Sequence, residues 1–391
     1  MHNTRKQDKI YGCLLGGAIG DAWGYPLEFR RDLSTNSPIP FPQPGLISDD
    51  TQMTLFTANA LLWRETRLAI KGIAMQPMDA IYLGYLDWLG TQTGIYQQHP
   101  ICWLKDIPEL QQRRAPGNTC LSALSSGKRG SLEKPINNSR GCGGIMRIAP
   151  LGLYTDDLAT AGLTAAQAIA LTHGHPLAIM PGYVLSVWLS LLTHINISLK
   201  EGLSLSLHLF QDNFGYFSPQ DKKDFLELVD KAISLSCQNI PDDAAIAQLG
   251  EGWLGDEALA ITIYACLRHP NDFQAAIITA THHAGDSDST GSIAGNIMGA
   301  YLGAQALPSS LTDHLELASV ITEIANDLSV DKPPVGDDIE HEDEHWLKKY
   351  LFVESNQQPD KQATTAIADN KSICNKFTDE LGKNIKIVMK S

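Results

Sequence analysis

The sequence predicts an all-α protein with a single compact multi-helix domain. Apolar residues recur at helical spacing along most of the chain, and few stretches alternate in the pattern of a strand. Ala, Leu, Ile and Gly are frequent, while only 7% of residues are aromatic, which favours closely packed helices over a sandwich of sheets. Apolar residues make up 43% of the 391, so the chain can bury a large core.

The helical pattern is concentrated between residues 10 and 330, which we take as one domain. Proline marks the loops, as in residues 37–44, where every second position is Pro and a helix is excluded. The predicted helical segments are residues 50–65, 74–90, 159–172, 177–196, 220–236, 255–268, 272–283, 288–305 and 311–328.

Residues 331–391 are predicted to form an acidic and polar C-terminal extension. Residues 337–344 are mostly acidic, and residues 356–372 have the composition of a linker. Apolar side chains return in residues 385–389 and could dock on another surface, but a solvated tail is the simpler interpretation.

Two segments carry glycine at every fourth position, which places the glycines on one face of a helix. These glycines are Gly12, Gly16, Gly20 and Gly24 in the first segment, and Gly291, Gly295, Gly299 and Gly303 in the second. Each glycine in a helix costs roughly 1 kcal/mol relative to alanine, so close packing must offset the loss. We therefore expect two helix backbones in near contact, and the two stripes could face each other.

Charge and cysteine usage exclude several classes of protein. The formal net charge is −14 at pH 7, which disfavours nucleic-acid binding as the main activity. The seven cysteines include no CxxC pair, so neither a disulfide framework nor a structural zinc site is expected, and a reducing compartment fits best. The apolar run at residues 11–19 is too short to span a bilayer. We expect a cytoplasmic protein that does not act at a membrane.

Residues 47–53, Ile-Ser-Asp-Asp-Thr-Gln-Met, are the first segment with candidate chemistry. Asp49 could cap a helix, with Gln52 three residues later completing a capping box. The same segment offers two adjacent carboxylates and two hydroxyls, which are hard oxygen ligands of the kind that Mg²⁺ or Mn²⁺ prefers. The segment alone leaves both interpretations open, with capping the simpler one.

Residues 282–291, His-His-Ala-Gly-Asp-Ser-Asp-Ser-Thr-Gly, form a second such segment before another helix. On an extended loop Asp286 and Asp288 would point to the same side and could share an ion. Because capping needs only one such group, two clusters at two helix starts predict a site for two metal ions roughly 4 Å apart. Oxygen-rich sites seldom recruit imidazole, so His282 and His283 are expected in the core or behind the ligands.

Residues 141–147, Gly-Cys-Gly-Gly-Ile-Met-Arg, are the third candidate segment. The backbone N–H groups of a glycine-rich loop can approach a phosphate closely. The segment is not a GxGxxG fingerprint and no strand precedes it, so by itself it indicates either a nucleotide-binding loop or a simple turn.

Taken together, these segments resemble the ADP-ribosylglycohydrolase family, which includes the dinitrogenase reductase-activating glycohydrolase and the animal ADP-ribosylhydrolases. Residues 20–28 resemble the first family motif, residues 48–51 the first metal motif, residues 141–150 the glycine-rich substrate loop, and residues 285–289 the second metal motif. The motifs follow the family order over residues 10–305. The resemblance implies an all-α fold with two Mg²⁺ or Mn²⁺ ions in a central cleft.

The resemblance also implies a role for individual residues. The metal ligands would be Ser48, Asp49, Asp50, Asp286, Asp288 and Ser289. Many relatives have Thr at the two serine positions, but the hydroxyl is retained. The substrate-binding residues would be Gly141, Cys142, Gly143, Gly144, Met146 and His173. His173 would lie beside the ribose, unless it serves only as a partner for a helix C-terminus. Glu28 matches a mobile glutamate that approaches the metals or the substrate in some relatives.

The implied reaction is hydrolysis at the anomeric carbon of the distal ribose, through an oxocarbenium-like transition state. Glu28 and Asp50 are both candidates for the group that transfers a proton. The serine-containing metal motifs resemble those of arginine-directed relatives. We therefore expect the substrate to be a protein with N-linked ADP-ribosyl-arginine, whose guanidinium an acidic rim would suit. O-linked ADP-ribose on serine is the alternative.

Two other classes of function are less well supported by the sequence. A binding or immunity-type protein on the same fold would not need six oxygen ligands. A two-metal phosphoesterase would normally carry His or bridging Asp patterns that are absent here.

Overall fold

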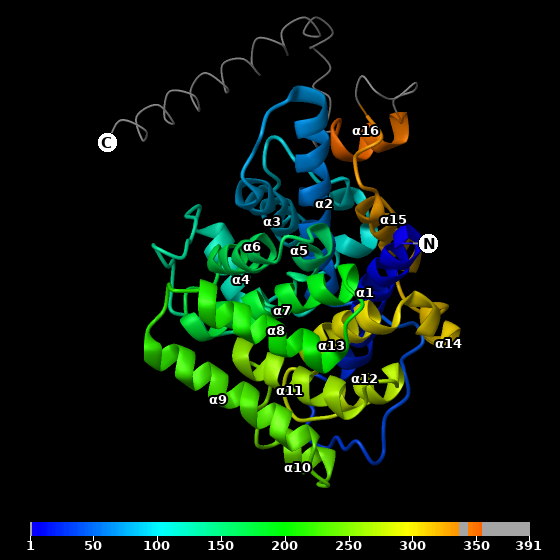
Figure 1. The fold of residues 1–391 in the computed structure, drawn as a ribbon. Helices are drawn as coiled ribbons and strands as arrows, with labels where there is room; N and C mark the ends of the chain where they lie inside the picture. Colours follow the sequence, from blue (N-terminus) through cyan, green and yellow to red (C-terminus); the bar gives the residue numbers. More distant parts are fainter. Residues whose placement is uncertain (1, 336–342, 354–391) are drawn as a thin grey trace, which may run out of the picture. The chain divides into compact units, whose positions relative to one another are not determined.

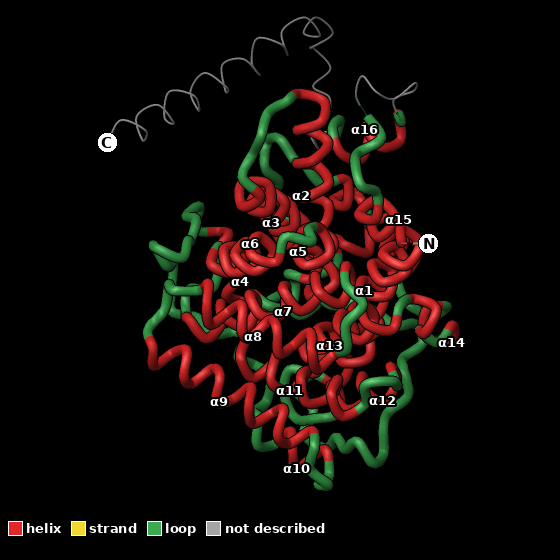
Figure 2. Tube along the Cα trace, viewed as in Figure 1, coloured by secondary structure: helices red, strands yellow, loops and turns green. Residues whose placement is uncertain are grey.

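The computed structural model describes residues 2–335 and 343–353 (Figure 1). Helices and loops make up this part of the chain, and its only β-type pairings are two isolated bridges (Figure 2). The α-helices are α1 His2–Gly24, α2 Asp49–Lys71, α3 Pro77–Thr93, α4 Asn118–Ser125, α5 Ala149–Tyr154, α6 Leu158–Ala170, α7 Pro176–His194, α8 Leu199–Asn213, α9 Pro219–Ser236, α10 Asp242–Ile246, α11 Gly255–Arg268, α12 Phe273–Thr281, α13 Ser287–Leu302, α14 Ser309–Thr312, α15 Ala318–Ser329 and α16 Glu344–Tyr350. The predicted all-α fold is confirmed.

Helices α1 and α13 form the most extensive helix pair in the described part of the chain. A Cβ atom on Gly12, Gly16 or Gly20 would collide with the carbonyl oxygen of a glycine in α13. The partners run in opposite order, from Gly299 to Gly291, so the helices are antiparallel. The expectation that the two glycine stripes pack against each other is confirmed. As a result, the C-terminal end of α1 lies beside the N-terminal end of α13.

Helix α7 runs through the middle of the bundle and packs against α5, α6, α8 and α11 (Figure 1). By length and composition it is apolar enough to cross a membrane, but 94% of its apolar window is buried inside the fold. Pro181 lies within it, and Trp188 is fully buried with its indole N–H donating to the Leu199 carbonyl oxygen at 3.0 Å. Within this fold α7 is the central core helix.

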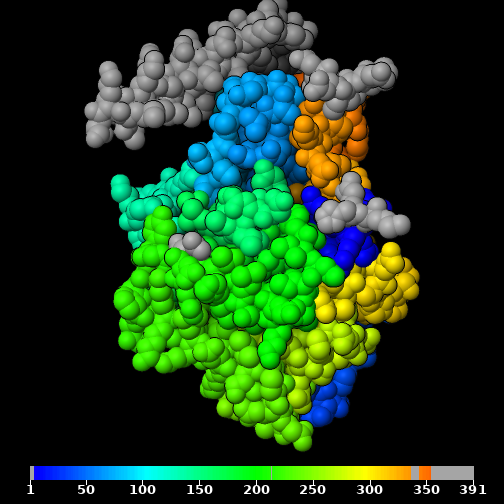
Figure 3. Space-filling model, in the orientation of Figure 1, coloured from blue at the N-terminus to red at the C-terminus, as the bar shows by residue number. Residues whose placement is uncertain are grey.

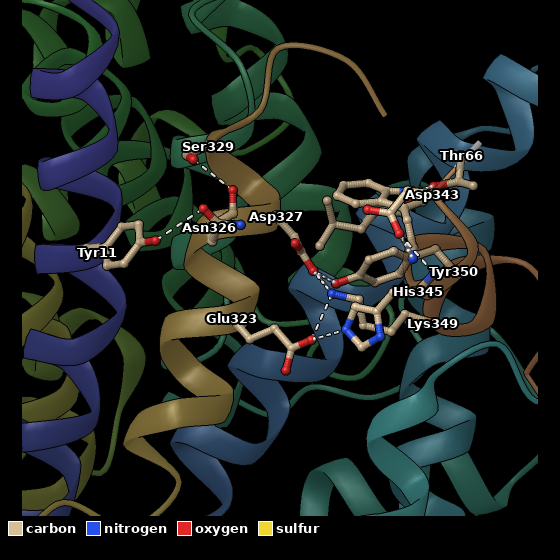
Figure 4. Close-up of polar contacts among 12 residues, drawn as sticks. Tyr11, Thr66, Glu323, Asn326, Asp327, Ser329, Asp343, His345, Lys349 and Tyr350 are labelled. Atoms are coloured by element: carbon tan, nitrogen blue, oxygen red, sulfur yellow. Dashed lines mark hydrogen bonds and ion pairs between the residues drawn. The ribbon is translucent and has the colours of Figure 1, made fainter. Parts of the chain in front are cut away.

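The predicted boundary near residue 330 falls between α15 and α16, but α16 still packs on the helical domain (Figure 3). The Trp346 indole N–H donates to the Thr66 hydroxyl of α2 at 2.8 Å. Lys349 is buried and pairs with Asp327 and Glu323 of α15 (Figure 4). The compact unit therefore extends to Val353. The apolar residues at 385–389 lie outside the described residues.

Candidate metal centre

Two helix N-termini carry most of the candidate ligands. Ser48 caps α2, and its hydroxyl accepts the N–H of Asp50 at 3.2 Å. The capping box that the sequence allowed at Asp49 is wrong, because the helix already begins at Asp49 and Gln52 instead donates to the Gln112 carbonyl oxygen at 2.9 Å. The Asp49 and Asp50 side chains are therefore not used as caps.

The second helix start differs from expectation in a similar way. Asp286 is the N-cap of α13 and accepts the N–H of Ser289 at 3.3 Å. Asp288 lies in the first turn of the helix, not on an extended loop as the sequence suggested, because α13 begins at Ser287. Gly285 precedes the cap with φ +128°, and a Cβ there would collide with the Glu251 carbonyl oxygen, so this turn requires glycine.

Asp21, in the last turn of α1, connects the start of α2 to the α1–α13 helix pair. Its carboxylate accepts the backbone N–H groups of Ser48, at 3.0 Å, and of Thr51, at 3.1 Å, and also the Thr51 hydroxyl. Asp21 is fully buried, and burial raises its pKa to about 6 although these hydrogen bonds oppose the rise. No separate role for Asp21 was predicted from the sequence, although this residue lies inside the motif at residues 20–28.

The carboxylates gathered here are buried without a cationic partner. Asp21, Asp49, Asp50, Asp286 and Asp288 are each at most 4% exposed, and no ion pair involves any of them in the described part of the chain. Burial first, and repulsion between neighbouring carboxylates second, raise the pKa of Asp50 and Asp288 well above their usual range. Asp50 Oδ1 is sealed from solvent and has no hydrogen-bond partner in the part of the chain that the structure describes.

Glu28 completes the cluster from the loop that follows α1. Carboxylate oxygens of Glu28, Asp286 and Asp288 lie within 4.8 Å of one another. Burial and the charge of Asp286 raise the pKa of the half-buried Glu28 to about 8. Clustered buried carboxylates, with the pKa values of Glu28, Asp50 and Asp288 raised, fit a divalent cation, because its charge would offset their repulsion and oxygen is the donor that Mg²⁺ and Mn²⁺ prefer. Glu28 was predicted as a catalytic group, and the structure places it against the second metal motif.

The glycine-rich segment borders this cluster. A short 3₁₀ helix spans Cys142–Gly144, and the Cys142 N–H donates to the Trp253 carbonyl oxygen at 3.0 Å. The Cys142 thiol donates to the Asp286 carboxylate at 2.6 Å, and the Ser289 hydroxyl lies 3.7 Å from the same sulfur. The predicted substrate loop and the second metal motif are therefore in direct contact.

Met146 and His173 are both buried beside the loop. The Met146 sulfur lies 3.9 Å from the Ser289 hydroxyl, so Met146 packs behind the second metal motif. His173 is 1% exposed, and its Nε2 lies 3.5 Å from the position that a Cβ at Gly141 or Gly143 would occupy. Both residues therefore lie where they could support or contact a ligand held by the loop.

His282 and His283 are core residues, as the sequence indicated. His282 Nε2 accepts the Ile39 N–H at 2.8 Å, and His283 Nε2 is 2.9 Å from the Thr290 hydroxyl. Each ring nitrogen that could bind a metal is thus engaged by the protein.

An aromatic pair at the edge of the site could not be predicted. Phe29, with φ +67° and 70% exposure, stacks on Trp253 with ring centroids 5.1 Å apart. Positive φ is uncommon for a bulky residue and marks a constrained loop next to Glu28. The pair joins two segments far apart in sequence, so no local pattern could indicate it.

The all-α fold brings two acidic helix starts together beside a glycine-rich loop, and comparison with known proteins identifies the family. The profile of the ADP-ribosylglycohydrolase family matches residues 2–336. The mouse ADP-ribosylhydrolase ARH3 is 24% identical over 350 residues, covering 78% of this chain and 87% of its own length. The bovine ARH3 is 23% identical over 351 residues, covering 78% and 88%.

A solved structure described as an ADP-ribosylglycohydrolase-related protein complex has the same fold, with a TM-score of 0.59 and 22% identity, and covers 83% of this chain and 98% of its own. The chain belongs to the ADP-ribosylglycohydrolase family, and its activity is that of a hydrolase on ADP-ribosylated substrates.

Proposed function

We propose that this protein is a metal-dependent hydrolase that releases ADP-ribose from arginine side chains of modified proteins, with two Mg²⁺ or Mn²⁺ ions as cofactors. The observation that carries the proposal is the set of buried carboxylates at the starts of α2 and α13, none of them paired with a cation among the described residues. The ligands proposed from the sequence are Ser48, Asp49, Asp50, Asp286, Asp288 and Ser289. Glu28 lies beside Asp286 and Asp288, with carboxylate oxygens of the three residues within 4.8 Å of one another.

Each group of residues has a distinct task in this proposal. The bound cations would supply Lewis-acid polarisation and orient the attacking water. The glycine loop Gly141–Gly144, with Met146 and His173 beside it, would hold the ADP-ribosyl group. Glu28 is the better candidate for proton transfer, because it is half-buried and within reach of water, whereas Asp50 is 2% exposed and lies among the other carboxylates.

Two arguments support the arginine linkage. The serine-containing metal motifs resemble those of arginine-directed relatives, and the edge of the site is acidic. Glu28 and Glu251 lie beside the pair formed by the exposed Phe29 and the partly buried Trp253, and the Trp253 indole N–H donates to Glu251 at 3.1 Å. A planar cation such as guanidinium is favoured by carboxylates and by aromatic faces together.

The test uses one target protein ADP-ribosylated either on arginine or on serine, with a nucleotide phosphodiester as a third substrate. We expect release of ADP-ribose from arginine to be the fastest reaction, to require Mg²⁺ or Mn²⁺, and to occur without cleavage of the phosphodiester. Release from serine at an equal or higher rate would overturn the linkage. Phosphodiester cleavage alone would overturn the glycosidic reaction, and tight ADP-ribose binding without turnover would favour a binding protein.

A further inference from the structure

Arg147 is a fully buried cation without a carboxylate partner. It follows Met146 at the end of the glycine segment, is 0% exposed, and forms no ion pair with any described residue. Its guanidinium lies over the Tyr85 ring, 4.2 Å from the centroid, and Nε has no hydrogen-bond partner within residues 2–335 and 343–353. Burial of an unpaired charge is unfavourable, so the hydrogen bonds and the ring contact of this side chain must offset the cost.

The terminal nitrogens of Arg147 start a short chain of hydrogen bonds. Nη2 donates to the Thr172 hydroxyl oxygen at 2.6 Å, and the same oxygen lies 2.8 Å from His173 Nδ1. A guanidinium can only donate, so the Thr172 oxygen accepts on this side. Among the described residues, His173 Nδ1 is the one atom that can accept the Thr172 hydroxyl proton. Nδ1 must then be unprotonated, and the proton of the neutral ring is on Nε2.

The Nε2 atom faces the glycine loop. A Cβ at Gly141 or at Gly143 would lie 3.5 Å from it, so the absence of side chains there keeps this nitrogen uncovered by the loop. Nε2 has no hydrogen-bond partner among the described residues. The Thr172 carbonyl oxygen accepts from the Asn137 side chain at 2.7 Å, which fixes the backbone that carries the histidine.

We propose that Arg147 and Thr172 are positioning residues that hold His173 as the neutral Nε2–H tautomer, so that Nε2 donates a hydrogen bond to an oxygen of the ADP-ribosyl group bound at the glycine loop. The identity of the acceptor rests on the proposed function, but the tautomer does not. Burial and the charge of Arg147 lower the pKa of His173 to about 3, so the ring stays neutral and the donor is present throughout the physiological pH range.

The tautomer is measured directly by nitrogen NMR on protein labelled with ¹⁵N-histidine, with the His173 signals assigned by their loss in His173→Gln. In the free wild-type enzyme we expect the ¹⁵N chemical shifts of a neutral His173 ring protonated at Nε2, unchanged between pH 6 and pH 8. Addition of free ADP-ribose should shift the Nε2 signal. A ring protonated at Nδ1, or a charged ring, would overturn the proposal whatever the Thr172 variants show.

Three variants test the relay. Thr172→Val removes the hydroxyl and keeps the shape, and Thr172→Ser keeps the hydroxyl. Thr193→Val is the matched control, because Thr193 is also buried but its hydroxyl has no hydrogen-bond partner among the residues that the structure describes. In Thr172→Val we expect a mixture of tautomers and ADP-ribose binding that is about tenfold weaker. The other two variants should stay within about twofold of wild type.

If Thr172→Val kept the wild-type His173 tautomer and the wild-type affinity for ADP-ribose, the positioning role of Thr172 would be wrong. A wild-type enzyme that shows the Nε2–H tautomer but fails to bind ADP-ribose would contradict the assigned acceptor and the proposed function, while leaving the positioning role of Arg147 and Thr172 in place.

Discussion

Gly20 of α1 and Gly291 of α13 pack backbone against backbone, so that a Cβ on either would collide with the carbonyl oxygen of the other. This contact sets where the acidic groups meet. Asp21 follows Gly20 directly, and Asp286 and Asp288 precede Gly291 by five and three residues. The glycine stripes therefore hold the end of α1 against the start of α13, and the candidate metal centre forms where they meet.

The first prediction concerns this packing. Gly20→Ala should lower the free energy of unfolding by about 1–3 kcal/mol, because the added methyl group meets backbone that cannot rotate away. Thermal unfolding measures the effect. Gly215→Ala is the control, since nothing lies within 4 Å of its Cβ position. Equal unfolding temperatures for Gly20→Ala and wild type would show that the helices are not in the close contact described.

The second prediction concerns pH and stability in the presence of a chelator. The pKa values of Asp21 and Glu28 are raised to about 6 and about 8, so the folded state retains protons that the unfolded chain has already lost. Stability should therefore be highest near pH 4–5 and fall as the pH rises to about 8. Saturating Mg²⁺ should remove most of this fall, because it binds the ionised carboxylates.

Asp288→Asn should reduce the same pH dependence, since it removes one of the repelling charges, whereas the exposed Asp156→Asn should not. The test is the unfolding temperature of wild type and both variants, recorded in chelator from about pH 4 to pH 8. A curve that rises toward pH 8 would mean that these carboxylates are stabilised as anions by the protein alone.

The third prediction separates the two candidates for proton transfer. Glu28→Gln should lower kcat by roughly a hundredfold and leave Mn²⁺ affinity within a few-fold of wild type, because the amide cannot transfer the proton. Asp50→Asn should weaken Mn²⁺ binding itself, because it removes a charge from a buried carboxylate that lies among the carboxylates of Asp49 and Asp286. Calorimetry measures the Mn²⁺ affinity of each variant, and initial rates measure its kcat. Weakened Mn²⁺ binding in Glu28→Gln, with only kcat lowered in Asp50→Asn, would exchange the two roles.

The fourth prediction concerns the C-terminal region. A chain ending at Val353 should keep full turnover and stability, because the family match ends at residue 336 and the compact unit ends at 353. A chain ending at Val335 should unfold at a lower temperature, because it exposes the surface that Trp346 and Lys349 cover. If the chain ending at Val353 kept its fold but lost turnover, the residues removed after Val353 would belong to the active site.

Much of this arrangement could be predicted from local sequence. Helical periodicity predicted the all-α fold, and the four-residue glycine spacing predicted the close helix pair. The acidic segments were predicted at two helix starts, but the exact cap was not, because Ser48 and Asp49 are both good caps and only the contact of Ser48 with Asp21 decides between them. The roles of Asp21, Phe29 and Arg147 depend on segments distant in sequence, so no spacing along the chain could indicate them.

The most direct test of the central claim is release of ADP-ribose from an arginine-ADP-ribosylated protein by wild type and by Asp288→Ala, with Asp156→Ala as the control. We expect wild type and the control to turn over with Mg²⁺ or Mn²⁺, to stop after exhaustive chelation, and to recover when the ion is restored. Asp288→Ala should be folded and inactive in every condition. Full turnover in chelator, or in Asp288→Ala, would contradict the assignment of this acidic cluster as the metal centre of the enzyme.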